Sequence, residues 1–97
     1  MKPDDRKVEL FEHALDISSS TGYMQLTRKA IADRSQVSEG LVTHYFGTME
    51  NLRRDIMRAA IKRELLPILA QGLAMRDKHA LKAPAELQKK AATSISN

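Results

Sequence analysis

Apolar residues recur along this chain at steps of three and four positions, the spacing that places side chains on one face of an α-helix. The alternation of apolar and polar positions that is typical of β-strands does not appear. Between the apolar stretches stand residues that cap or end helices, chiefly Gly, Ser, Thr and Pro. The pattern therefore predicts an all-α fold of helices joined by turns.

The first helix is expected from about Asp4 to Ser19. Pro3 suits a helix start because its missing N–H is harmless there, and the acidic residues that follow favour the helix dipole. Gly22 suits the left-handed position that closes many helices. The predicted apolar stripe consists of Val8, Phe11, Ala14 and Leu15, widened by Leu10 and Ile17.

Two short helices are predicted next, over Arg28 to Ser35 and from Ser38 to about Tyr45. Thr27 and Ser38 have hydroxyls that can cap them. A turn at Ser35 to Val37 separates the two. Such a pair, running from about Thr27 to Phe46, is a helix-turn-helix, in which the first helix braces against the DNA backbone and the second enters the major groove. The predicted inward residues are Ala30, Ile31, Ala32, Val37 and Val42.

The rest of the chain predicts three more helices. Gly47 closes the third helix and Thr48 caps a long fourth one, Met49 to Leu65, which ends because Pro67 cannot continue it. A fifth helix is expected over Pro67 to Leu81 and a short last one over Pro84 to Ala92, followed by a frayed tail from Thr93 to Asn97. We expect one compact domain, with a DNA-binding region over 1–48 and helices that complete the core over 49–97.

The stretch from Leu26 to Leu52 resembles the TetR family of transcriptional repressors, and the resemblance extends over about residues 8–60. The shared pattern is a threonine, an Ile-Ala pair, Val-Ser-x-Gly, Tyr-Phe, a capping Ser or Thr, and Glu-x-x-Leu. In this chain it is carried by Thr27, Ile31-Ala32, Val37-Ser38-Glu39-Gly40, Tyr45-Phe46, Thr48, Glu50 and Leu52.

The resemblance implies a TetR-like three-helix DNA-binding bundle. It also implies a sequence-specific transcriptional regulator, expected to be a cytoplasmic repressor that binds a palindromic operator in double-stranded DNA as a homodimer. Glu39, Leu41, Thr43 and His44 would read base edges, and Gly40 would allow close approach to the groove. The expected DNA contacts are Thr27, Arg28, Lys29, Ser38, Glu39, Gly40, Leu41, Thr43, His44, Tyr45 and Arg53.

The chain also departs from the family pattern. Many members have threonine and tyrosine where this chain has Leu41 and Thr43, and a lysine where it has Met49. Ser18 stands where an apolar aromatic residue is usual, which predicts looser packing of the first helix. These departures keep the docking mode but make the operator sequence unpredictable.

Length is the largest departure, since about 45 residues follow Asn51. Typical members add a larger helical domain that dimerises and holds an inducer, so a small-molecule inducer is not expected here. The apolar C-terminal residues are expected to form a minimal dimer interface, unless they serve only to cover the chain's own core. The predicted interface residues are Leu65, Ile68, Leu69 and Leu73.

Charge leaves an alternative open. The formal net charge of +4 suits a polyanionic partner, but residues 1–50 hold six basic and eight acidic residues, whereas residues 51–97 hold ten and four. The acidic first half favours a protein-interaction module, such as an antirepressor that binds another regulator through Leu41 and the apolar C-terminal residues. A basic amphipathic segment at a membrane surface, over residues 53–76, is a weaker option.

Other kinds of chemistry find little support. The chain has no cysteine, and its three histidines, His13, His44 and His79, do not form a metal-ligand spacing. No catalytic triad, glycine-rich phosphate loop or paired carboxylate stands out, so we expect neither an enzyme nor a cofactor. No apolar run approaches the roughly 18 residues that a membrane span needs, so no membrane partner is expected.

Overall fold

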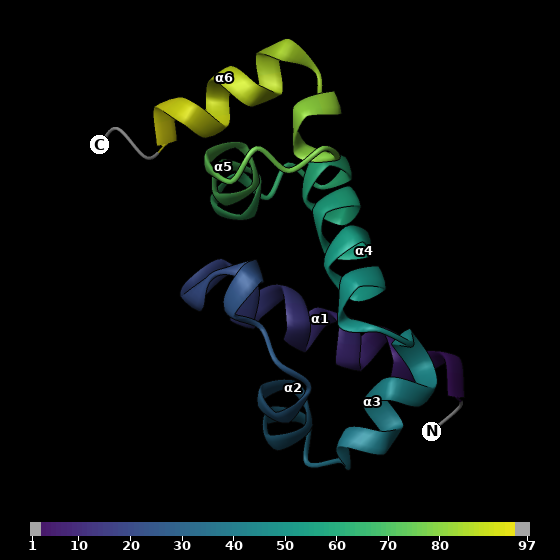
Figure 1. Ribbon diagram of the computed structural model, residues 1–97. Helices are drawn as coiled ribbons and strands as arrows, with labels where there is room; N and C mark the ends of the chain where they lie inside the picture. The colour runs from purple at the N-terminus through teal and green to yellow at the C-terminus, as the bar shows by residue number, and fades with distance from the viewer. Residues whose placement is uncertain (1–2, 95–97) are drawn as a thin grey trace. The chain divides into compact units, whose positions relative to one another are not determined.

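The computed structural model describes residues 3–94 of the chain, and every regular element in that range is a helix (Figure 1). This confirms the all-α prediction. The elements in chain order are α1 (Pro3–Thr21), the 3₁₀ turn η1 (Tyr23–Gln25), α2 (Arg28–Ser35), α3 (Glu39–Phe46), α4 (Met49–Lys62), α5 (Leu66–Ala74), the 3₁₀ turn η2 (Ala80–Lys82) and α6 (Ala85–Ser94).

The chain divides into two compact units, of which the first ends at Arg53 and the second begins at Arg54. The boundary therefore lies inside α4, a few residues after the boundary between residues 48 and 49 that the sequence suggests. The first unit holds α1, η1, α2, α3 and the start of α4. The second holds the rest of α4 together with α5, η2 and α6.

Helix α1 buries one stripe of small and aliphatic residues in the first unit. Leu10, Ala14 and Ser18 follow one another at steps of four and are fully buried, and Leu15 lies beside them. Val8 was predicted to belong to this stripe, but it is 59% exposed. The stripe packs against α2 and η1.

The end of α1 lies two residues beyond the predicted end at Ser19. Thr21 donates a hydrogen bond from its hydroxyl to the carbonyl oxygen of Ile17 at 2.8 Å, and Ser20 donates to the carbonyls of Asp16 and Ile17 at 3.2 Å. These bonds let polar residues remain in the last turn. Gly22 then stops the helix with a positive φ of 107°, which glycine adopts readily, although its ψ of 134° lies outside the left-handed αL conformation that was predicted.

Helix α4 ends at Lys62, before the predicted end at Leu65. Glu64 adopts a left-handed φ of 54°, and the N–H of Leu65 donates to the carbonyl of Ala60 at 2.8 Å, which closes the last turn. Pro67 then lies in the first turn of α5, where a missing N–H is harmless. The predicted break near Pro67 is therefore confirmed, although it begins earlier.

Helix α5 ends at Ala74, so the predicted helix up to Leu81 is wrong. Arg76 has a left-handed φ of 57°, and the N–H of Asp77 donates to the carbonyl of Gly72 at 2.8 Å. The Asp77 carboxylate then accepts hydrogen bonds from the N–H groups of His79 and Ala80, at 2.8 and 3.2 Å, which starts η2. The left-handed conformation of Arg76 and the hydrogen bonds that Asp77 accepts therefore end α5, although the apolar spacing in the sequence continues to Leu81.

Helix α6 lies beside α5 within the second unit (Figure 1). Leu87 and Ala91, one turn apart, are the buried residues of α6. The helix runs to Ser94, which corrects the prediction of a frayed tail from Thr93; the last three positions of that tail lie outside the described residues. None of the helices described is both long and apolar enough to cross a membrane.

Candidate nucleic-acid interface

The turn between α2 and α3 has a well-defined backbone geometry. Gln36 takes the left-handed conformation, with φ 58°, and its N–H donates to the carbonyls of Ala32 and Asp33 at the end of α2. The N–H of Val37 donates to Ala32 as well, at 3.0 Å. These bonds close α2 in the manner that glycine usually provides, so the predicted turn at Ser35 to Val37 is confirmed.

Both helices of the helix-turn-helix begin at the predicted caps. The Thr27 hydroxyl accepts a hydrogen bond from the N–H of Ala30, and the Ser38 hydroxyl accepts one from the N–H of Leu41, each at 3.1 Å. Thr48 caps α4 in the same way, with a 3.1 Å bond from the N–H of Asn51. Three consecutive helix starts are therefore determined by local side-chain chemistry.

Helices α2 and α3 pack through a small apolar contact in the first unit. Ile31, Ala32 and Val42 are almost fully buried, as predicted, whereas Ala30 and Val37 are half-buried. Phe46, at the end of α3, is also half-buried and lies against Phe11 of α1, with 6.2 Å between ring centroids. Because the buried side of α3 is narrow, most of its other residues face away from the core.

The exposed face of α3 carries Glu39, Gly40, Thr43 and His44. Leu41 and Tyr45 flank that face and are half-buried. The Tyr45 ring meets the His44 ring edge-on, with centroids 5.2 Å apart, so the two rings restrict one another. A Cβ atom on Gly40 would meet nothing closer than the Ser38 hydroxyl at 3.8 Å, so the space in front of Gly40 is open.

The bracing helix α2 presents two further exposed residues that were predicted to contact DNA. Thr27 is exposed even though its hydroxyl caps the helix. Lys29 forms an ion pair with Asp33 at 3.2 Å, and both side chains are largely exposed. Such an exposed pair is weak, so a phosphate can replace the aspartate as the partner of this lysine.

Arg28 and Arg53 were predicted to contact DNA. In the structure, both side chains form hydrogen bonds within the first unit. Arg53 donates from Nη2 to the carbonyl oxygen of Leu26 at 3.2 Å, and Arg28 donates from Nη2 to the carbonyl oxygen of Gly47 at 3.5 Å. Both arginines are half-buried, and their Nε atoms are enclosed by protein. Each side chain therefore links two segments that are far apart in the sequence.

A second link, which the sequence does not reveal, joins α2 to α1. Arg34 lies 3.0 Å from the Asp16 carboxylate and donates from Nε to Nδ1 of His13 at 3.2 Å. This group lies at the surface, so it orients the two helices more than it stabilises them. No local spacing signals it, because α1 and α2 are separated by η1.

The predicted dimer residues differ in how much surface they expose. Ile68 and Leu69 are fully buried inside the chain, so neither offers surface to a second copy. Leu65 and Leu73 are half-buried. Met75 and Leu81, at 59% and 51% exposure, are the large apolar side chains most exposed in the second unit over residues 54–94.

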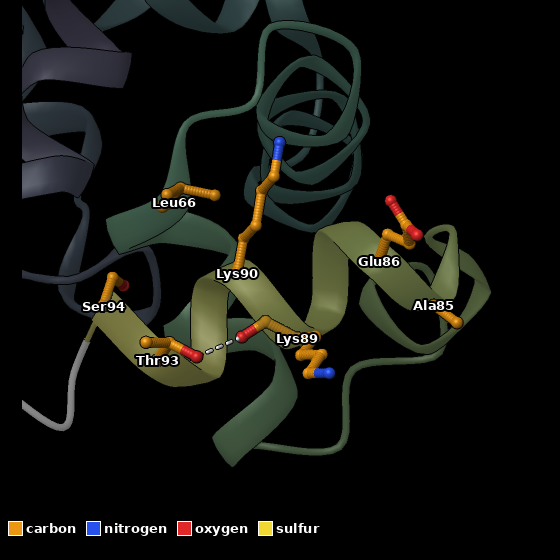
Figure 2. A pocket seen from close by; sticks show the side chains of 7 residues that line it. All are labelled: Leu66, Ala85, Glu86, Lys89, Lys90, Thr93 and Ser94. Carbon is orange, nitrogen blue, oxygen red and sulfur yellow. Dashed lines mark hydrogen bonds between the residues drawn. The ribbon is translucent and has the colours of Figure 1, made fainter.

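An open groove of about 590 Å³ lies between α6 and Leu66 at the start of α5 (Figure 2). Lys90, on the groove side of α6, lies 3.6 Å from the Glu64 carboxylate. The groove opens widely to solvent, whereas small-molecule pockets bury most of their ligand. Over residues 5–94, whose side chains the structure describes, no group of three possible metal-ligating side chains comes together. The residues that line the groove are Leu66, Ala85, Glu86, Lys89, Lys90, Thr93 and Ser94.

Comparison with known proteins agrees with this geometry. The sequence model of the family described as bacterial regulatory proteins, tetR family, matches residues 9–56. The HTH-type transcriptional regulator BetI of Paraburkholderia phytofirmans is 32% identical over 66 residues, an alignment that covers 60% of this chain and 34% of BetI. The chain thus spans about a third of the length of that relative. No solved structure matches the chain.

The family match covers α2, the turn and α3, together with most of α1 and the first half of α4. These are the elements whose caps, turn and exposed face are described above. Residues 9–56 of this chain are therefore an N-terminal helix-turn-helix region of the tetR family of bacterial regulatory proteins.

Proposed function

We propose that this chain is a DNA-binding transcriptional regulator that places α3 in the major groove of double-stranded DNA and acts as a repressor. The observation that carries the proposal is the exposed face of α3, where Glu39, Thr43 and His44 project around the open space at Gly40. A helix must present polar side chains and approach closely in order to read base edges. This face of α3 meets both requirements.

Three side chains would make the base contacts. Glu39 can accept a hydrogen bond from a cytosine amine, and the methyl group of Thr43 can touch a thymine methyl. The Thr43 hydroxyl donates to the carbonyl of Glu39 at 3.3 Å, which orients its methyl group. His44 can donate to guanine or to a phosphate. Leu41 is half-buried, so we assign it a smaller apolar contact at the edge of the groove.

Phosphate contacts would come from both helices. Thr27 and Lys29 lie exposed at the start of α2, and Ser38 is exposed at the start of α3. Helix N-termini favour anions because their N–H groups and dipole point at the ligand. Tyr45 would add its hydroxyl from the end of α3. These contacts position the protein but do not read sequence.

We further propose a homodimer on a palindromic operator. One recognition helix contacts few base pairs, and dimers of helix-turn-helix proteins place two such helices about 34–36 Å apart on successive turns of the groove. The surface after Ile61 offers half-buried Leu65 and Leu73 together with exposed Met75 and Leu81. Occupation of an operator that overlaps a promoter would then block transcription.

Selection from a random duplex library, followed by a binding titration, tests the proposed function. Unaltered protein is expected to enrich a defined palindrome and to bind it at least a thousandfold more tightly than a random duplex of the same length. Affinity should fall steeply with salt concentration because counterions are released from the DNA. Failure to enrich any sequence would refute specific DNA recognition.

A protein-interaction module is the second candidate, and the charge balance favours it. Residues 1–50 carry a net formal charge of −2, and two of their cations, Lys29 and Arg34, already pair with Asp33 and Asp16. An antirepressor would bind another regulator through Leu41 and the apolar C-terminal residues. It would bind random and selected duplexes equally weakly, so the titration above separates the two candidates.

A further inference from the structure

Two arginine side chains form hydrogen bonds between segments at the two ends of the helix-turn-helix. Arg53, in the first half of α4, donates to the carbonyl of Leu26, the residue just before the Thr27 cap of α2. Arg28, the first residue of α2, donates to the carbonyl of Gly47, the residue that closes α3. The entry to α2 is thus tied to α4, and the exit of α3 is tied to the start of α2.

The orientation of both guanidinium groups favours an internal role. Each Nε atom is enclosed by protein, and one Nη atom of each group is taken by a backbone carbonyl. A bidentate phosphate contact instead requires a guanidinium whose N–H donors are unpaired and point toward solvent. Lys29, with 73% of its side chain exposed, provides the contrast, because it lies next to Arg28 and buries much less of itself.

We propose that Arg28 and Arg53 are positioning residues, which hold α3 at the angle that reads DNA and make no phosphate contact themselves. The proposal rests on the DNA-binding function proposed above. Recognition by a helix requires its side chains to be held within a fraction of an ångström of their partners. A hydrogen bond at each end of the motif restricts the rotation of α3 relative to α2 and α4.

The chain offers a matched control for Arg53. Arg54 is the next residue, and it bonds to its neighbour Asp55 at 3.3 Å rather than to a distant carbonyl. Arg53→Met and Arg54→Met remove the same charge from adjacent positions and keep an unbranched apolar stem. Any difference between the two variants therefore reports the contacts of the half-buried Arg53 side chain inside the protein, including its bond to Leu26, and not the loss of a cation.

DNA binding is measured on a palindrome recovered from the random duplex library with unaltered protein, and on a random duplex of equal length. Arg53→Met should lower the ratio of specific to non-specific affinity on the order of tenfold relative to Arg54→Met, since the loss of one charge-assisted hydrogen bond disturbs docking. The two variants should have the same salt slope. A slope reduced by about one unit in Arg53→Met alone would identify a phosphate contact and overturn the proposal.

Amide hydrogen exchange of the free protein supplies a readout without DNA. Arg53→Met and Arg28→Met should each raise the exchange rates of residues 39–46, whereas Arg54→Met and Lys29→Met should leave them unchanged. Equal rates in all four variants would overturn the proposal. So would unfolding of both Arg53→Met and Arg28→Met in buffer, because the two arginines would then support the whole fold and not the position of α3.

The two proposals fail in different ways. If the unaltered protein prefers no duplex, the proposed function fails, and the exchange rates alone decide whether the arginines position α3. If a palindrome is bound but exchange and salt slope behave as for phosphate contacts, the function stands and the positioning role falls.

Discussion

The hydroxyl of Ser38 accepts a hydrogen bond from the N–H of Leu41 at 3.1 Å. This bond satisfies one of the donors that a helix start leaves without an intrahelical partner, and it determines the residue at which α3 begins. Because α3 has eight residues, it is too short to be stable in isolation and depends on such local bonds and on packing. The cap therefore helps to keep the candidate reading face helical.

Ser38→Ala is expected to lower the free energy of unfolding by about 1 kcal/mol, since it removes the cap of α3. Ser38→Asn should retain most of the stability, because asparagine is an equally good cap. Urea unfolding followed by circular dichroism measures both. Ser19→Ala, an exposed change in the last turn of α1, is the control, and a loss no larger than in that control would contradict the assigned cap.

Gly72→Ala is expected to destabilise the second unit. A Cβ atom there would clash with the side chains of Met57 and Ala80, and all three residues are buried. Overpacking of this kind costs about 1–3 kcal/mol, which exceeds the roughly 1 kcal/mol that alanine gains over glycine in a helix. Gly40→Ala, with open space around it, should instead raise the thermal midpoint, and the opposite order of midpoints would contradict this packing.

The sequence predicted the helix-turn-helix well because its signals are local. Thr27, Ser38 and Thr48 each lie three residues before the N–H that they accept from, and Gly22 and Gly47 close the helices before them. Such short-range chemistry needs no knowledge of the fold. The TetR resemblance then placed the correct family, over nearly the same residues as the family match.

The sequence was misleading at the end of α5 and wherever distant residues decide. Apolar spacing continues through Leu81, but the left-handed Arg76 and the hydrogen bond that Asp77 accepts end α5 first, and apolar spacing does not register these local signals. An apolar residue is also predicted to be buried without any indication of what covers it, so Ile68 and Leu69 could not be told apart from interface residues. Likewise, the sequence does not distinguish an arginine that binds a phosphate from one that, like Arg53, binds a carbonyl 27 positions away.

Dimerisation is tested on the exposed apolar surface of the second unit. Met75→Glu should shift sedimentation from dimer to monomer while leaving the circular dichroism spectrum unchanged, because 59% of Met75 is exposed. Leu69→Glu would be uninformative, since a buried charge would unfold the chain. Met24→Glu, in the first unit and 46% exposed, is the matched control. A dimer unaffected by Met75→Glu would place the interface elsewhere, and a monomer at all concentrations would contradict the homodimer.

Backbone and base contacts should respond differently to mutation. Lys29→Ala should weaken binding to every duplex alike and reduce the salt slope by about one unit, because one phosphate contact is lost. Thr43→Ala and His44→Ala should cost on the order of 1–3 kcal/mol on the selected palindrome and relax preference at single positions. Titrations on single-base variants of the palindrome measure both patterns. A uniform loss for Thr43→Ala would argue against base reading by this residue.

Gly40→Gln is the most direct test of DNA reading by α3. Gly40 is exposed and faces open space, so a long side chain can be accommodated without unfolding, but it would hold α3 away from the groove. Binding of Gly40→Gln to the selected palindrome is measured beside Gly40→Ala, with the thermal midpoint of each. We predict a native-like midpoint and at least a tenfold loss of affinity for Gly40→Gln. Full affinity in a folded Gly40→Gln protein would contradict major-groove recognition by α3.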